Sequence, residues 1–70
     1  MPTTISIVVN GQEHVAGAGA TVTDLLRELG LDPGRVAIER NLEILPRSEW
    51  AERRVQPGDL YEIVQFVGGG

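Results

Sequence analysis

The sequence contains no cysteine and no lysine, and it has a single histidine among its 70 residues. Without cysteine the chain can form no disulfide and offers no thiolate, either as a nucleophile or as a metal ligand. His14 alone cannot make a histidine metal cluster. We therefore expect no metal site and no thiol chemistry in this protein.

Long apolar runs and a basic surface are missing as well. The longest uncharged apolar stretch is far too short to span a bilayer, and the N-terminal residues lack the basic region and apolar stretch of a signal peptide. The formal net charge of −4 argues against nucleic acid as a partner. The composition predicts one small cytoplasmic domain with neither a membrane nor a nucleic-acid partner.

The N-terminal third predicts a β-hairpin. A β-rich stretch ends in Asn10-Gly11, the strongest short hairpin signal, and residues 12–16 return as a second strand. A two-residue turn sets His14 opposite Ile7, whereas a longer, bulged turn brings Val15 to the face of Ile7 instead. In this interpretation His14 is a strand residue at the margin of a sheet, not a catalytic base.

The stretch after the hairpin predicts an amphipathic helix of about two turns. Thr21 is a suitable N-cap, Asp24 completes a capping box, and Gly30 fits the left-handed position after the last turn, with Leu31 packing back onto Leu26. Apolar residues recur at the i, i+3, i+4 and i+7 spacing of a buried helix face, at Val22, Leu25, Leu26 and Leu29.

The second half predicts three more strands, over residues 36–40, 43–45 and 60–67. Residues 32–35 and 56–59 carry proline and glycine where type II turns need them. A single helical turn is expected after Pro46, with Ser48 as its candidate cap and Trp50 packed in the core.

The first and last strands are the most apolar, which suits neighbouring central strands. The C-terminus then leaves from the middle of the sheet. This order predicts an α+β protein with the β-grasp, or ubiquitin-like, fold: a mixed sheet of about five strands and one main helix. We place the domain at residues 1–67 and a glycine tail at residues 68–70.

Catalytic constellations are nearly absent. Ser6 and Ser48 do not form a recognisable Ser/His/Asp set with the one histidine. The glycines of residues 17–20 precede a helix but lack the spacing and the lysine of a phosphate-binding loop. Four glutamates are interpreted as solvated surface, at Glu39, Glu43, Glu49 and Glu52. We expect no catalytic residue and no bound cofactor.

The remaining reactive group is the carboxylate of Gly70. The tail formed by Gly68, Gly69 and Gly70 reaches roughly 10 Å when extended, enough to thread a narrow channel in another protein. Glycine suits that task because it has no Cβ to meet the channel walls. The alternative is that the three glycines are terminal fray or a cloning remnant.

Specific motifs run along the whole chain, and the tail is one of them. They are "VNGQ", "TVTDLL", "VAIERN", "ILPRSEW", "PGD" and "EIVQFVGGG". Together they resemble the ThiS-type sulfur carriers of thiamine biosynthesis. The resemblance implies that a ThiF-type adenylyltransferase activates the Gly70 carboxylate with ATP, and that a sulfur donor system converts it to a thiocarboxylate. A ThiG-type thiazole synthase then receives the sulfur, while Gly68 and Gly69 thread the partner's channel.

The same resemblance makes the chain a co-substrate of its partners, not an enzyme. We predict that Tyr61 and Ile63 face the helix, and that Val64, Phe66 and Val67 form a partner interface beside the tail. The alternative places Phe66 in the core.

Three other functions stay open: a small subunit of molybdopterin synthase, a ubiquitin-like modifier, and a β-grasp binding module with an inert tail. The missing lysines reflect either codon bias or a surface that cannot form amides with an activated C-terminus of its own kind.

Overall fold

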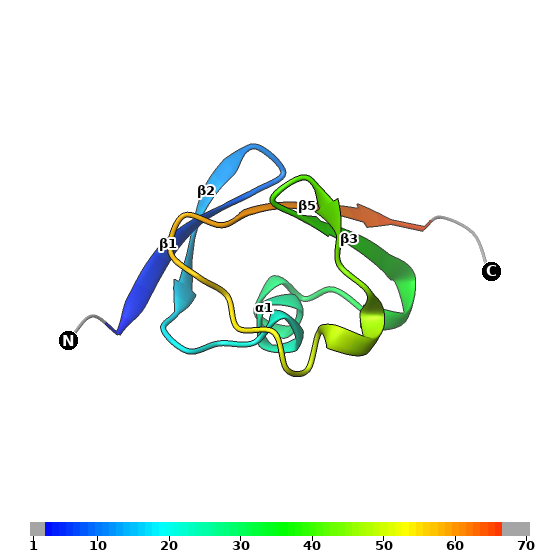
Figure 1. Cartoon of the computed structure of the whole chain (residues 1–70), viewed down its shortest axis with the longest axis horizontal. Helices are drawn as coiled ribbons and strands as arrows, with labels where there is room; N and C mark the ends of the chain where they lie inside the picture. The colour runs from blue at the N-terminus through cyan, green and yellow to red at the C-terminus, as the bar shows by residue number, and fades with distance from the viewer. Residues whose placement is uncertain (1–2, 67–70) are drawn as a thin grey trace.

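The fold is a curved sheet that wraps one helix, as Figure 1 shows. The computed structural model describes residues 3–66. In chain order the elements are β1 (Thr4–Val9), β2 (Gln12–Gly17), α1 (Val22–Leu29), the 3-10 helix η1 (Pro33–Arg35), β3 (Val36–Arg40), β4 (Glu43–Ile44), the 3-10 helix η2 (Arg47–Glu49) and β5 (Leu60–Gln65).

The sheet has five strands in the order β2-β1-β5-β3-β4. The first and last strands pair in parallel, and the other neighbouring strands pair antiparallel. This arrangement confirms the predicted mixed β-grasp sheet, with β5 in its centre. The strand β5 lies between β1 and β3 at its start, where Leu60 and Tyr61 pair with β1, and its last residues up to Gln65 pair with β3 alone (Figure 1).

The β1–β2 hairpin has the shorter of the two predicted turns. Asn10 and Gly11 both have positive φ, 50° and 81°, as a two-residue type I′ turn requires. Ile7 pairs with His14, so His14 lies on the helix-facing side of the edge strand and Val15 is exposed on the other side. His14 is thus a marginal strand residue, as predicted.

The helix α1 begins and ends as its sequence predicts. The Thr21 hydroxyl accepts a hydrogen bond from the Asp24 amide at 3.1 Å, and the Asp24 carboxylate accepts one from the Thr21 amide at 3.0 Å. Gly30 ends the helix with φ of 72°, and the amide of Leu31 donates to the Leu26 carbonyl. The apolar face of α1 is buried against the sheet at Val22, Leu25 and Leu26.

Trp50 is buried in the core, as expected, and its indole N–H donates to the Leu45 carbonyl at 3.0 Å. Leu45 itself turns inward and is buried, so β4 ends one residue earlier than predicted, at Ile44. No helix within residues 3–66 is long and apolar enough to cross a membrane.

Two local predictions are wrong. Residues 32–35 form a 3-10 turn instead of a type II turn: the Asp32 carboxylate accepts from the Gly34 amide at 2.8 Å, and Gly34 does not take a positive φ. Ser48 is not a cap, because η2 starts after Pro46, whose fixed φ already suits a helix start. The second predicted type II turn is confirmed by Gly58, with φ of 81°.

Candidate functional site

The end of β5 presents apolar side chains to solvent. Tyr61 and Ile63 face the helix and are buried, whereas Val64 is 60% exposed and Phe66 is 54% exposed. This confirms the predicted alternation and excludes a core position for Phe66. Val67 and the three glycines lie outside the described residues, so their roles as interface, threading tail and modified group stay predictions.

The backbone is fixed up to Phe66. The antiparallel register of β3 and β5 continues to the pair Val36 and Gln65, and the Phe66 amide then donates to the Arg35 carbonyl at 2.8 Å. On the other side, the Asn10 side chain donates to the Ile63 carbonyl and accepts from the Ile63 amide. Both flanks of β5 are therefore hydrogen-bonded close to the point where the chain leaves the fold.

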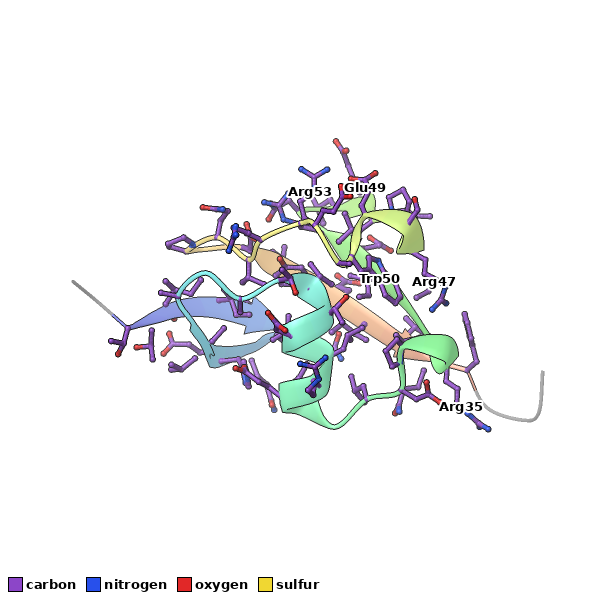
Figure 2. The ribbon with its side chains drawn as sticks, turned by 90° about the horizontal axis from the view of Figure 1, so that it is seen from below. Arg35, Arg47, Glu49, Trp50 and Arg53 are labelled. Atoms are coloured by element: carbon purple, nitrogen blue, oxygen red, sulfur yellow. The ribbon has the colours of Figure 1, made fainter. Side chains whose placement is uncertain are left out.

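Arg47 holds the turn that is hydrogen-bonded to the end of β5. Its guanidinium donates to the Val36 carbonyl at 3.0 Å and to the Pro33 carbonyl, and it stacks on Trp50 with 4.6 Å to the ring centroid. Figure 2 shows Arg47 beside Trp50, on the side of the molecule where Arg35 lies. The Pro-Arg-Ser-x-Trp motif thus fixes η1, and the Arg35 carbonyl of η1 accepts the hydrogen bond from the Phe66 amide.

A buried carboxylate lies at the other end of β5. Asp59 is 5% exposed, and its oxygens accept hydrogen bonds from four residues, namely Arg40, Asn41, Gln56 and Tyr61. Burial alone would raise the pKa of Asp59, but these hydrogen bonds outweigh it and hold the pKa below its ordinary value. Burial of Tyr61, and then its hydrogen bond to the Asp59 carboxylate, raise the pKa of the phenol. The cluster is a structural anchor for the start of β5.

Sequence reasoning missed both Arg47 and Asp59 as anchors. In the sequence Arg47 stands in the Pro-Arg-Ser-x-Trp motif and Asp59 at the end of a predicted turn. Their partners lie 14 and 19 residues away along the chain, at Pro33 and Arg40. The one local signal is the spacing of Arg47 three residues before Trp50, which places the guanidinium over the indole ring on a helical turn.

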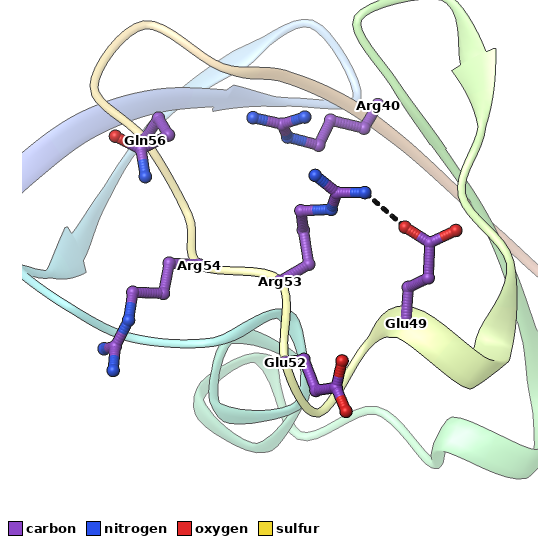
Figure 3. A pocket seen from close by; sticks show the side chains of 6 residues that line it. All are labelled: Arg40, Glu49, Glu52, Arg53, Arg54 and Gln56. Carbon is purple, nitrogen blue, oxygen red and sulfur yellow. Dashed lines mark hydrogen bonds and ion pairs between the residues drawn. The ribbon is translucent and has the colours of Figure 1, made fainter.

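A charged hollow of about 420 Å³ lies beside η2, and Figure 3 shows its side chains. Its arginines serve the fold: Arg53 pairs with Glu49, Arg40 with Asp59, and Arg54 donates to the Gly19 carbonyl at 2.7 Å. Such internal pairing makes the hollow part of the scaffold instead of a reaction site.

No catalytic set forms from the hydroxyl and imidazole groups considered above. Ser6 pairs with Val15 and lies on the outer face of the sheet, whereas His14 faces the helix. Within residues 3–66 no three acidic or histidine side chains come together to hold a metal ion.

Comparisons with known proteins identify the family. The profile of the ThiS family matches residues 3–70. The "Sulfur carrier protein ThiS" of Escherichia coli K12 is 36% identical over 66 residues, covering 94% of this chain and 100% of that protein. The crystal structure of a thiamine biosynthesis protein (ThiS) from Geobacter metallireducens superimposes with a TM-score of 0.80 at 32% identity, covering 94% of this chain and 100% of that one.

A longer protein contains a similar segment. A "Thiazole synthase" of Paramagnetospirillum magneticum is 52% identical over 66 residues, covering 94% of this chain, and the match spans only 20% of that protein. The profile match, the full-length carrier relative and the matching structure together show that this chain belongs to the ThiS family.

Proposed function

We propose that this chain is a sulfur carrier of thiamine biosynthesis and that the carboxylate of Gly70 carries the sulfur. The observation that carries the proposal is the rigid central strand β5, hydrogen-bonded up to Phe66 and followed in sequence, after Val67, by three glycines. A carrier without cysteine must attach sulfur to carbon, and a terminal carboxylate is the evident carbon.

The chemistry requires activation because a carboxylate is a poor electrophile. In the proposed sequence a ThiF-type adenylyltransferase joins the Gly70 carboxylate to the AMP part of ATP and releases pyrophosphate. A sulfur donor system then supplies sulfur at the oxidation level of hydrogen sulfide. This sulfur attacks the glycyl carbonyl and displaces AMP, which leaves a thiocarboxylate. A ThiG-type thiazole synthase takes up the sulfur and the carboxylate is regenerated, so the chain acts as a co-substrate and ATP is bound by its partner.

An intact-mass measurement tests the proposed function. After incubation with the adenylyltransferase, ATP and a sulfur donor, we expect the mass gain of one oxygen replaced by sulfur, and no gain when ATP is omitted. An unchanged mass in the complete mixture would support an inert binding module. Covalent ladders on other proteins would support a ubiquitin-like modifier.

The exposed aromatic ring beside the tail is expected to contact the partner enzymes. Phe66→Ala should weaken binding to the adenylyltransferase or the thiazole synthase by roughly tenfold, as loss of an interface aromatic does. The free energy of unfolding should change little, since the ring is 54% exposed and leaves no core cavity. Titration calorimetry and urea unfolding measure the two quantities.

Val15→Ala is the matched control for that substitution, because Val15 is 58% exposed on the far edge strand β2. It should leave binding unchanged. A Phe66→Ala variant that loses stability and shows no separate binding defect would contradict the interface assignment.

A further inference from the structure

The face of the sheet that points away from α1 carries a second apolar surface. A shallow hollow of about 100 Å³ opens there over β3, β4 and β5, lined by Ala37, Ile38, Glu39, Ile44, Glu62 and Val64. Ile44 is 80% exposed, and Leu42, in the turn before β4, is 74% exposed. We call this surface the outer-sheet patch and define it as Leu42, Ile44 and Val64 with the flanking Glu39 and Glu62.

Leu42 has a backbone conformation that a leucine rarely adopts. Asn41 and Leu42 form the turn between β3 and β4 with φ of 51° and 73°, and glycine is the residue that such a turn prefers at its second position. The side chain is also left in water. Neither local geometry nor burial explains a leucine at this position, and strained residues of this kind gather at functional sites.

Two acidic residues of the patch oppose each other. Glu39 of β3 pairs directly with Glu62 of β5, and like charges in that position destabilise a sheet. Arg40, the next residue along β3, is on the opposite face and is bound to Asp59. A basic side chain from outside the fold would relieve this repulsion.

Acidic and apolar groups also alternate along β3 and β5 on this face. Ile44 lies beside Glu39, which lies beside Glu62, and the next row pairs Ala37 with Val64. Val64 belongs both to this patch and to the exposed end of β5, so the two surfaces are continuous. A partner that covers the patch would also fix the direction in which β5 leaves the fold.

We propose that the outer-sheet patch binds a surface of the thiazole synthase that presents aliphatic side chains beside lysine or arginine. The inference rests on the proposed function, because a sulfur acceptor must hold the carrier while the C-terminus reaches its reaction site. The thiazole synthase of Paramagnetospirillum magneticum contains a segment 52% identical to this chain, which favours that enzyme as the occupant. The apolar groups bind by burial, and the opposed glutamates select a basic rim.

Leu42→Gly is the sharpest test because binding and stability should respond differently. With the full chain and the thiazole synthase of the same organism, we expect the dissociation constant to rise roughly tenfold by titration calorimetry. The urea midpoint should stay unchanged or increase, because glycine accepts the positive φ. A lower affinity caused by unfolding would instead appear as a lower midpoint.

The double variant Glu39→Gln with Glu62→Gln tests the charge part of the proposal. Affinity should fall severalfold and its dependence on salt should flatten, while stability stays unchanged or rises. Glu13→Gln and Val15→Ala are the controls, because both residues are exposed on the outer face of the distant strand β2. They should leave affinity and salt dependence as they are.

Unchanged affinity in both patch variants would overturn the proposed surface. Patch variants that lose affinity for the adenylyltransferase alone would also overturn it. The intact-mass assay keeps the two proposals apart: a wild-type chain that gains sulfur while its patch variants bind normally contradicts only the patch. A wild-type chain that never gains sulfur contradicts the proposed function itself.

Discussion

Deletion of Gly70 is expected to lower thiazole formation by at least about a hundredfold in a mixture of carrier, adenylyltransferase, ATP, sulfur donor and thiazole synthase. The shortened chain still ends in two glycines, so its terminal carboxylate keeps the same chemistry. What changes is the reach, by about 3.3 to 3.6 Å for one extended residue. A displacement of about 1 Å at a reacting atom can already cost a hundredfold in rate.

Val15→Ala provides the control for this deletion, because Val15 is 58% exposed on the far edge strand β2. It leaves the whole tail as it is, so thiazole formation should stay within a few-fold of wild type. The urea midpoint of both variants should equal that of wild type, since neither change touches the hydrogen bonds that fix β5 up to Phe66. Undiminished thiazole formation by the deletion variant would mean that tail length does not position the glycyl carbonyl.

Local sequence signals predicted most elements of this fold. Asn10-Gly11 fixed the hairpin because both residues accept positive φ, and Thr21 with Asp24 fixed the helix start through bonds three residues apart. The exposure of Val64 and Phe66 followed from the two-residue period of a strand once Tyr61 was assigned to the core. In each case the deciding contact lies within a few residues of the signal.

The contacts that sequence reasoning missed join distant parts of the chain. The guanidinium of Arg47 reaches carbonyls 11 and 14 residues away, and Asp59 reaches Arg40 across 19 residues. The error at residues 32–35 has a different cause, because the Asp32 carboxylate competes for the Gly34 amide and stabilises a 3-10 turn. Leu42 could not be anticipated either, since its conformation is set by the pairing of β3 with β4.

The roles of Val67 and the three glycines depend on the sequence and the family, because these residues lie outside the described part of the chain. The fold determines the residues that come directly before this segment. A central strand, held by Asn10 on one side and by Arg35 on the other, fixes the position and direction of Phe66. A short tail can find a reaction site efficiently only if its starting point is fixed relative to the docked body.

Asp59→Asn should cause the largest loss of stability among the substitutions considered, about 3 kcal/mol of unfolding free energy. The carboxylate accepts from the Arg40 guanidinium at 3.0 Å, the Tyr61 hydroxyl at 2.9 Å and the Gln56 amide at 2.9 Å. These three bonds go to Oδ2, whereas Oδ1 accepts from the Arg40 guanidinium and from the Asn41 side-chain amide, each at 3.3 Å. An asparagine that keeps its oxygen at the Oδ2 position turns its NH2 group toward those two donors. It also leaves Arg40, whose side chain is only 23% exposed, without its counter-charge.

Asp32→Asn is the control, because Asp32 also accepts a backbone hydrogen bond and pairs with an arginine, but both partners of that ion pair are exposed. Its unfolding free energy in urea should stay within about 0.5 kcal/mol of wild type. Equal effects of the two substitutions would contradict the assignment of Asp59 as a buried anchor.

The pH dependence of unfolding should show the same anchor with a definite sign. Burial opposes ionisation of Asp59, but its hydrogen bonds outweigh burial, so the pKa of this carboxyl is lower in the folded protein than in the unfolded chain. Its stabilising contribution is therefore complete above the unfolded pKa of about 3.9 and is lost as the pH falls through the folded pKa. Arg40 stays charged over this range.

Urea midpoints measured downward from about pH 6 should fall for wild type below about pH 4, and fall less steeply for Asp59→Asn. The pKa of Asp24 is also lowered, by its hydrogen bonds with Thr21, but Asp24 is present in both proteins. The difference between the two curves therefore isolates Asp59. Parallel curves would mean that this carboxyl titrates alike in the folded and unfolded chains, and that the four donors around it do not favour its ionised form.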